Sequence, residues 1–189
     1  MTTNTGPGLN ENLVDQLDFH WHNQLRPRLE GLTDDEYFWE PVPHCWNVRP
    51  RGNGTAQVQA GSGDFTIDFA YPEPSPTPVT TIAWRLGHLI VGVLGARVAG
   101  HFDGPPCEYM TWSYAGTAAD ALDQLDQAYG RWTDGVRSLG EEGLAQPCGP
   151  VEGKWAEYTM AELVLHINRE VIHHGAEIAL LRDLYAHRR

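Results

Sequence analysis

The feature that most constrains this chain is the spacing of its apolar residues, which recur every three or four positions in four long segments. Such spacing places the apolar side chains on one face of a helix, and that face must be buried against another element. The segments predict helices over residues 9–30, 80–100, 117–139 and 159–185. Four amphipathic helices in 189 residues predict an all-α fold, a four-helix bundle formed by one domain over residues 1–189.

The link between the first two helices is predicted to carry a little β-structure. The first helix contains Pro27, which lacks a backbone N–H, so the helix is expected to kink or end near that residue. Residues 31–79 are rich in glycine and proline and are therefore expected to be mostly irregular. Within them, Asp64–Phe69 alternates polar and apolar residues as a strand does, and Trp46–Arg49 can pair with it. We expect a small β-hairpin in this long connection.

Turn residues and caps predict where the remaining elements begin and end. Thr80 or Thr81 can cap the second helix, because a threonine oxygen accepts a hydrogen bond from a free amide of the first turn. Residues 140–153 are predicted to form a loop, and about the first nine residues, 1–9, are expected to be disordered. Gly175 lies inside the fourth helix, where glycine costs about 1 kcal/mol relative to alanine, so a closely packed neighbour is expected there.

The overall charge and the cysteines exclude several classes of protein. The chain has 13 Lys and Arg against 25 Asp and Glu, a net charge of -12, which argues against binding to nucleic acid. No continuous apolar run approaches the roughly 20 residues that span a bilayer, and the N-terminus lacks the pattern of a secretory signal. The three cysteines form no CxxC pair and are expected to be reduced thiols. The sequence thus predicts a cytoplasmic protein without nucleic-acid or membrane partners.

The fourth predicted helix contains several side chains that can bind a metal ion. His166, Glu170 and His174 are spaced four residues apart and so lie along one face, with His173 beside them. Such a row is costly to bury unless each group finds a hydrogen bond, an opposite charge or a metal ion. His88 lies within the apolar run of the second helix and has the same requirement.

We predict that His88, Glu170 and His174 form one metal site. Together they offer two nitrogens and one oxygen to a divalent ion and leave a coordination position open, as catalytic ions require. Taken singly, each has a plainer interpretation: a satisfied core histidine, or a surface ion pair worth about a few tenths of a kcal/mol. His22 and the nearby His20 are candidates for the pocket around the site, although one of them is expected to face solvent, because each residue along a helix turns the side-chain direction by about 100°.

Two runs of sequence carry a family resemblance. Thr80–Leu89, TTIAWRLGHL, and Leu165–Ile178, LHINREVIHHGAEI, resemble the DinB/YfiT-like superfamily of metalloenzymes. The likeness extends from about residue 10 to 186. It is strongest to the actinobacterial branch that includes mycothiol-dependent maleylpyruvate isomerase and the mycothiol S-transferases. The resemblance implies a DinB-like bundle, a small-molecule substrate and association as a homodimer.

The resemblance also implies a ligand set. A divalent ion would be held by His88 and by the pair Glu170 and His174; many members have two histidines in that pair, and the isomerase branch is similar in using a glutamate. Zinc is the expected ion, with nickel, manganese or iron as alternatives, since these metals also accept nitrogen and oxygen ligands. His173 is interpreted as a hydrogen-bond partner of the site rather than a substitute ligand, and His166 is placed in the surrounding pocket.

The activity that the resemblance implies is the metal-assisted activation of a low-molecular-weight thiol such as mycothiol, a cosubstrate that attacks a small electrophile. None of the three cysteines, Cys45, Cys107 and Cys148, lies in the matched runs, so no cysteine of the chain is predicted as nucleophile. Arg85 and Arg169 can bind a substrate carboxylate or pair with acidic residues. A hydrolase that uses metal-bound water and a non-enzymatic metal-binding stress protein remain alternative functions.

Overall fold

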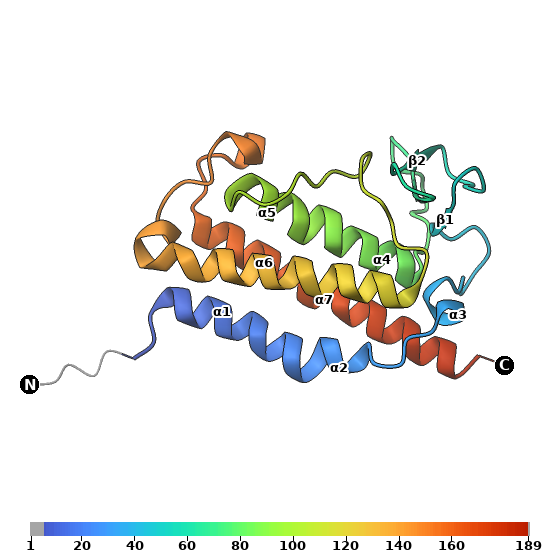
Figure 1. Cartoon of the computed structure of the whole chain (residues 1–189), viewed down its shortest axis with the longest axis horizontal. Helices are drawn as coiled ribbons and strands as arrows, with labels where there is room; N and C mark the ends of the chain where they lie inside the picture. Colours follow the sequence, from blue (N-terminus) through green and yellow to red (C-terminus); the bar gives the residue numbers. More distant parts are fainter. Residues whose placement is uncertain (1–5, 189) are drawn as a thin grey trace, which may run out of the picture.

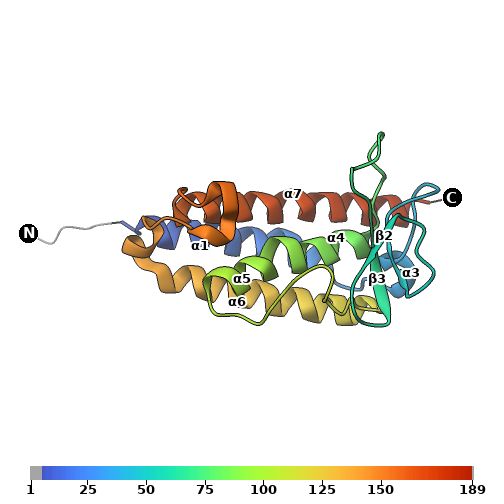
Figure 2. The same ribbon diagram turned by 90° about the horizontal axis from the view of Figure 1, so that it is seen from above.

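The computed structural model describes residues 6–188 and confirms the predicted helical bundle (Figure 1). Four long helical rods lie side by side, and a small sheet covers one end (Figures 1 and 2). The first rod consists of α1 Leu9–His20, the π-helix η1 Trp21–Leu25 and α2 Arg26–Arg28. The second consists of α4 Ile82–His88, the π-helix η2 Leu89–Gly95 and α5 Ala96–His101. The third is α6 Ala118–Leu144 and the fourth is α7 Met160–Ala186, with the short helix α3 Asp34–Tyr37 after the first rod.

The apolar face predicted for each rod forms the common core. Leu17, Leu86, Leu125 and Val171 come from the four rods in turn, and all are completely or almost completely buried. Threonines cap the last three rods: the Thr81 hydroxyl accepts from the Trp84 amide, and Thr117 and Thr159 do the same three residues ahead. The choice between Thr80 and Thr81 is thus settled in favour of Thr81, and the predicted helix starts are confirmed.

The first rod ends where its proline predicts. Pro27 lies inside α2, and the rod closes at Leu29, whose amide donates to the Arg26 carbonyl at 3.0 Å. The π-helical segment η1 immediately precedes α2. A proline cannot donate to the carbonyl four residues earlier, and a wider π turn is one way in which a helix absorbs such a change in its ladder.

The predicted hairpin is a three-stranded antiparallel sheet. Strand β3 Phe65–Phe69 lies between β1 Val48–Pro50 and β2 Val58–Ala60. The expected pairing is present, with Val48 opposite Ile67, but strand β2 was not predicted. Three residues are too few to show a clear alternation of polar and apolar side chains, so this strand is formed by its pairing with β3 rather than by its own pattern.

A fully buried carboxylate joins this sheet to the second rod. Asp68 of β3 accepts from the Arg49 guanidinium at 2.9 Å, from the Gln59 amide at 2.7 Å and from the Asn47 backbone at 3.0 Å. The side chain of Asn47 in turn accepts a hydrogen bond of 2.7 Å from Thr81, the cap of α4. The sheet therefore fixes the start of the helix that carries His88.

The loop predicted at residues 140–153 is only partly irregular. Gly140 has a φ of 58° and interrupts α6, but one further helical turn follows it up to Leu144. A 3₁₀ helix, η3 Pro150–Trp155, occupies the end of the segment. Composition predicted the break at Gly140, since glycine adopts positive φ at no steric cost, but short helical turns beyond a break leave no periodic pattern to read.

The second rod is also longer and more apolar than its continuous runs suggested. By length and composition alone the 20-residue helix Ile82–His101 could cross a membrane, although 56% of its most apolar stretch is buried in the bundle. Polar residues such as Arg85 divide this helix into shorter apolar runs, which is why no uninterrupted run approached the length of a membrane span. Its apolar side chains face the other helices, as the most enclosed rod of a bundle requires.

Gly175 has the close neighbour that its position in a helix predicted. A Cβ there would lie 3.1 Å from both terminal methyl groups of Leu25 and 3.3 Å from the Nε2 atom of His20. Gly130, inside α6, has no heavy atom within 4 Å of an added Cβ. We expect Gly175→Leu to lower the free energy of unfolding by about 1–3 kcal/mol through overpacking, and Gly130→Ala to raise it by about 0.5–1 kcal/mol. Urea unfolding of both variants checks this, and equal effects of the two would contradict the packing described for Gly175.

The buried Asp68 network makes a second prediction. Asp68→Ala leaves the Nε atom of Arg49, the backbone amide of Asn47 and the side-chain amide of Gln59 without this acceptor, although Arg49 keeps its ion pair with Glu40 at 2.8 Å. Several unpaired buried donors together cost about 3–5 kcal/mol of stability. The matched control is Asp134→Ala: this carboxylate is 80% exposed and meets Arg137 at 3.4 Å, so its loss should change stability by no more than about 0.5 kcal/mol. Thermal unfolding followed by circular dichroism compares the two, and a small effect of Asp68→Ala would refute its role as anchor.

Candidate metal centre

The three residues predicted as metal ligands lie at the contact between the second and fourth rods. His88 is the last residue of α4, where the helix passes into η2, and its ring meets that of His174 edge to face with centroids 4.7 Å apart. On α7, the Nε2 atom of His174 is 3.6 Å from Oε2 of Glu170. Both His88 and Glu170 line the same cavity. The structure thus brings His88 to the neighbouring pair Glu170 and His174, which lie 82 and 86 positions further along the sequence.

His88 is held in its neutral form with one nitrogen committed. Its Nδ1 atom is 2.6 Å from the hydroxyl of Tyr109, and its ring stacks on that of Trp84. Burial, and next the neighbouring His174, lower the pKa of His88 to about 4. Burial also raises the pKa of Tyr109 to about 12, so the phenol stays protonated. A neutral imidazole whose Nδ1 faces a hydroxyl leaves Nε2 as the nitrogen for a further partner.

His174 is oriented by a carboxylate that sequence analysis did not select. Its Nδ1 atom is 2.7 Å from Oε2 of Glu177, and the same carboxylate forms an ion pair with Arg85 of α4. A proton on Nδ1 is therefore donated to Glu177, which turns Nε2 toward Glu170. Glu177 follows His174 by three residues, a spacing that places both on one helix face, and this was the signal available in the sequence.

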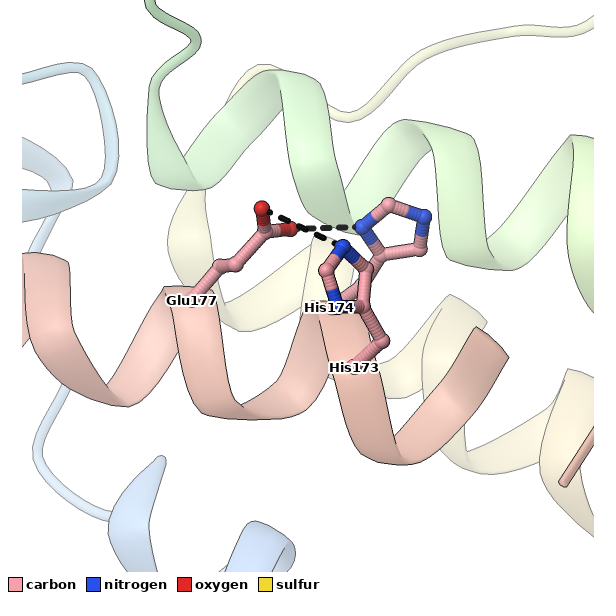
Figure 3. A group of neighbouring side chains, drawn as sticks. All are labelled: His173, His174 and Glu177. Carbon is pink, nitrogen blue, oxygen red and sulfur yellow. Dashed lines mark hydrogen bonds and ion pairs between the residues drawn. The ribbon is translucent and has the colours of Figure 1, made fainter. Parts of the chain in front are cut away.

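His173, His174 and Glu177 form a second group that could hold a cation. Their ligand atoms lie within 4.8 Å of one another, and Figure 3 shows both imidazoles turned toward the Glu177 carboxylate. However, the guanidinium of Arg85 already contacts Glu177 and lies 3.4 Å from Nδ1 of His174. An ion at this point would meet a fixed positive charge, and His173 is 61% exposed.

In the donor set of His88, Glu170 and His174, the guanidinium beside the carboxylate is that of Arg169, which is 3.6 Å from Oε1 of Glu170, whereas His174 faces Oε2 of the same carboxylate. Each imidazole has its Nδ1 atom bound to a group of the protein, a hydroxyl for His88 and a carboxylate for His174, and each has Nε2 left over. This is the arrangement in which histidines bind metals, since the partner at one nitrogen fixes the tautomer and orients the other. Two nitrogens and a carboxylate oxygen suit a divalent transition-metal ion, so the residues present fit such an ion.

The remaining predicted residues lie at different distances from this centre. The Nδ1 atom of His166 is 3.5 Å from Oε1 of Glu170 and 2.6 Å from the guanidinium of Arg169, so both flank the carboxylate. His22 is exposed and lies edge-on to Tyr129 of α6, which places it away from the centre. The buried member of that pair is His20, whose Nε2 atom has no hydrogen-bond partner among the described residues.

A cavity of about 450 Å³ opens beside the centre. Its wall includes His88, Tyr109, His166 and Glu170. Cys107 also lines it, but burial raises the pKa of this thiol to about 11, so the thiol is protonated at neutral pH and is a poor nucleophile. The cavity can admit a small molecule to the centre, and any reactive thiolate in it must come from outside the chain.

Comparisons with known proteins bear on this site directly. A model of the DinB superfamily matches residues 16–178, a range that includes His88, Glu170 and His174. Neither the comparison with curated proteins nor that with solved structures found a match.

Proposed function

This chain belongs to the DinB superfamily, and from that premise we propose that it is a metal-dependent S-transferase that joins a low-molecular-weight thiol of the mycothiol type to small electrophiles in the cytoplasm. The observation that carries the proposal is the set of two oriented imidazoles and one carboxylate, His88, His174 and Glu170, of which His88 and Glu170 line a cavity. The volume of about 450 Å³ lies within the usual range for small-molecule sites.

In this proposal the ion is held by Nε2 of His88, Nε2 of His174 and the carboxylate of Glu170, with zinc as the expected metal and nickel, manganese or iron as alternatives. A divalent ion, when bound, supplies a positive charge that lowers the pKa of a thiol and so maintains thiolate near neutral pH. With only His88, His174 and Glu170 as protein ligands, such an ion would keep a position open for the thiol of the cosubstrate.

The chain's own groups orient the ligands and protect their protonation states. In the tautomer that leaves Nε2 free, the Nδ1–H group of His88 donates a hydrogen bond to the Tyr109 hydroxyl, and the Nδ1–H group of His174 donates one to the Glu177 carboxylate. Arg85 balances the charge of Glu177, so this carboxylate remains an acceptor for His174 and does not compete for the ion. His166, which lines the cavity, and Arg169 flank Glu170 and supply donors to a substrate that approaches the centre.

The protonated state of Cys107 supports a thiol that enters from solution. Among the cysteines of the chain it is the one that lines the cavity, and burial keeps it from ionising at neutral pH. Cys45 and Cys148 are also buried free thiols whose pKa values are raised by burial. A protein nucleophile is therefore absent from the described part of the cavity wall, whereas a thiol cosubstrate would need only the open position at the ion.

The metal content of four proteins tests the proposed ligands. We expect protein produced without a histidine tag to retain about one ion per chain after dialysis, and His88→Ala and Glu170→Ala to lose it, because removing one of three ligands weakens binding well beyond the 10–100-fold of an outer contact. His173→Ala is the matched control and should keep its metal. Elemental analysis measures the content. Metal retained in His88→Ala but lost in His173→Ala would instead assign the ion to the group of His173, His174 and Glu177.

The activity has its own test. Metal-loaded protein should conjugate a chromogenic electrophile when mycothiol or bacillithiol is supplied, and His88→Ala should lower the rate by about 100-fold, a loss of about 2.7 kcal/mol of transition-state stabilisation. Turnover that is unaffected when the thiol is omitted contradicts the proposal, and thiol-independent hydrolysis that His88→Ala abolishes would identify a hydrolase. Chelation that lowers the melting temperature, with no turnover in either assay, would point to a non-enzymatic metal-binding protein.

A further inference from the structure

A second cavity of about 340 Å³ adjoins the one at the metal centre. It lies where the 3₁₀ helix η3 folds back beside α5 and the first turns of α7 (Figures 1 and 2). Arg97 and His166 line both cavities, so the two cavities adjoin at these side chains. The proposed thiol chemistry makes no use of the second cavity, and its lining indicates what it would bind.

The acidic side chains of this cavity are already paired. Glu152 of η3 accepts from His101 at 3.0 Å and lies 3.4 Å from Arg97, and its side chain is largely buried. Glu162 accepts from the backbone and hydroxyl of Thr159 at 2.8 and 2.9 Å in the cap of α7. Glu152 therefore has two partners within the protein, whereas Glu162 uses Oε2 in the cap of α7 and has no partner for Oε1 among the described residues.

The arginines of the cavity keep donors to spare. Arg97 donates to the Gly92 carbonyl at 2.6 Å and lies 3.4 Å from Glu152, a long distance for a charged pair; its Nε atom is buried without a partner among the described residues, and the side chain is 25% exposed. Arg169 is 70% exposed, bonds His166 and reaches Glu170 only at 3.6 Å. A guanidinium has five N–H donors in a planar fork that matches a carboxylate. The unused hydrogen-bonding capacity of this cavity is therefore that of a site for an anion.

Two aromatic rings complete the wall. Trp155 and Tyr158 pack edge to face with centroids 5.1 Å apart, and they are 49% and 46% exposed. Both line the cavity together with Leu163. Large aromatic side chains exposed next to unpaired guanidinium donors suit a ligand with a flat or apolar part beside its charge. The nearby negative charges of Glu152 and Glu162 favour a singly charged carboxylate over a doubly charged phosphate, because each added charge is repelled by both.

We propose that the second cavity binds a carboxylate of the molecule whose reactive end lies at the metal centre, with Arg97 and Arg169 donating to its oxygens and Trp155 and Tyr158 packing against the adjoining carbons. Only the identity of the reactive end rests on the proposed function. The carboxylate subsite itself is defined by the second cavity, and it makes Arg97 and Arg169 residues that determine specificity.

Calorimetric titration of the metal-loaded full chain with phenylacetate and with its neutral isostere phenylacetamide tests the subsite. We expect phenylacetate to bind at least about tenfold more tightly, and Arg97→Gln and Arg169→Gln each to weaken it by about tenfold while leaving phenylacetamide unchanged, since a hydrogen bond to a charged group contributes about this much. Arg137→Gln is the control for the loss of one positive charge, because Arg137 lies on α6 and pairs with Asp18 and Asp134.

Three outcomes would overturn the subsite: equal affinity for the two probes, phenylacetate binding that Arg169→Gln leaves unchanged, or phenylacetate binding that disappears when a chelator removes the metal, which would place the probe on the ion. If Arg97→Gln fails to fold, Arg169→Gln decides, because that side chain is exposed. Failure of thiol transfer with phenylacetate binding intact contradicts the proposed function alone. Thiol transfer without selective phenylacetate binding contradicts the subsite alone.

Discussion

The shared carboxylate of Glu177 is the interaction on which the geometry of the candidate site depends. It joins Arg85 of α4 to His174 of α7, and so ties the two helices that carry the predicted ligands. A guanidinium and an imidazole at a partly buried contact need such a partner, because an unpaired charge there costs several kcal/mol. By accepting a hydrogen bond from the Nδ1–H group of His174, Glu177 also decides which nitrogen of that ring faces Glu170. One contact thus supplies both packing and orientation.

The same contact separates two ways in which His174 could bind an ion. Toward Nδ1 lie Glu177 and the exposed His173, where the guanidinium of Arg85 already supplies the positive charge. Toward Nε2 lie Glu170 and the ring of His88, and the nearest fixed cations there contact the far side of the Glu170 carboxylate. Electrostatics therefore favours the Nε2 side, although the Nδ1 side has the shorter distances in the absence of an ion.

The sequence predicts whatever follows from a repeated local pattern. The four rods, their caps and the shared helix face of Glu170 and His174 come from helical periodicity, which acts within a few residues. The role of Glu177 depends on Arg85, which is 92 residues away, and strand β2 depends on its pairing with β3. Such contacts are set by how the rods meet, and no local pattern records them. The same holds for His22, since the rotation of the first rod about its own axis decides whether His22 or His20 is buried.

The fourth rod also explains how one helix can serve two tasks. Its residues at positions 170 and 174 face α4 and the proposed metal centre, while Glu162, His166 and Arg169 line the second cavity. Glu162 is eight residues before Glu170, about 12 Å along the axis at about 1.5 Å per residue, whereas Arg169 directly precedes Glu170, so the second cavity starts beside the proposed centre and extends away from it along the helix. The network of Glu152 with Arg97 and His101 fixes η3 against α5 and so sets the width of the cleft between them. Substitutions in η3 would then alter the second cavity while leaving His88, Glu170 and His174 in place.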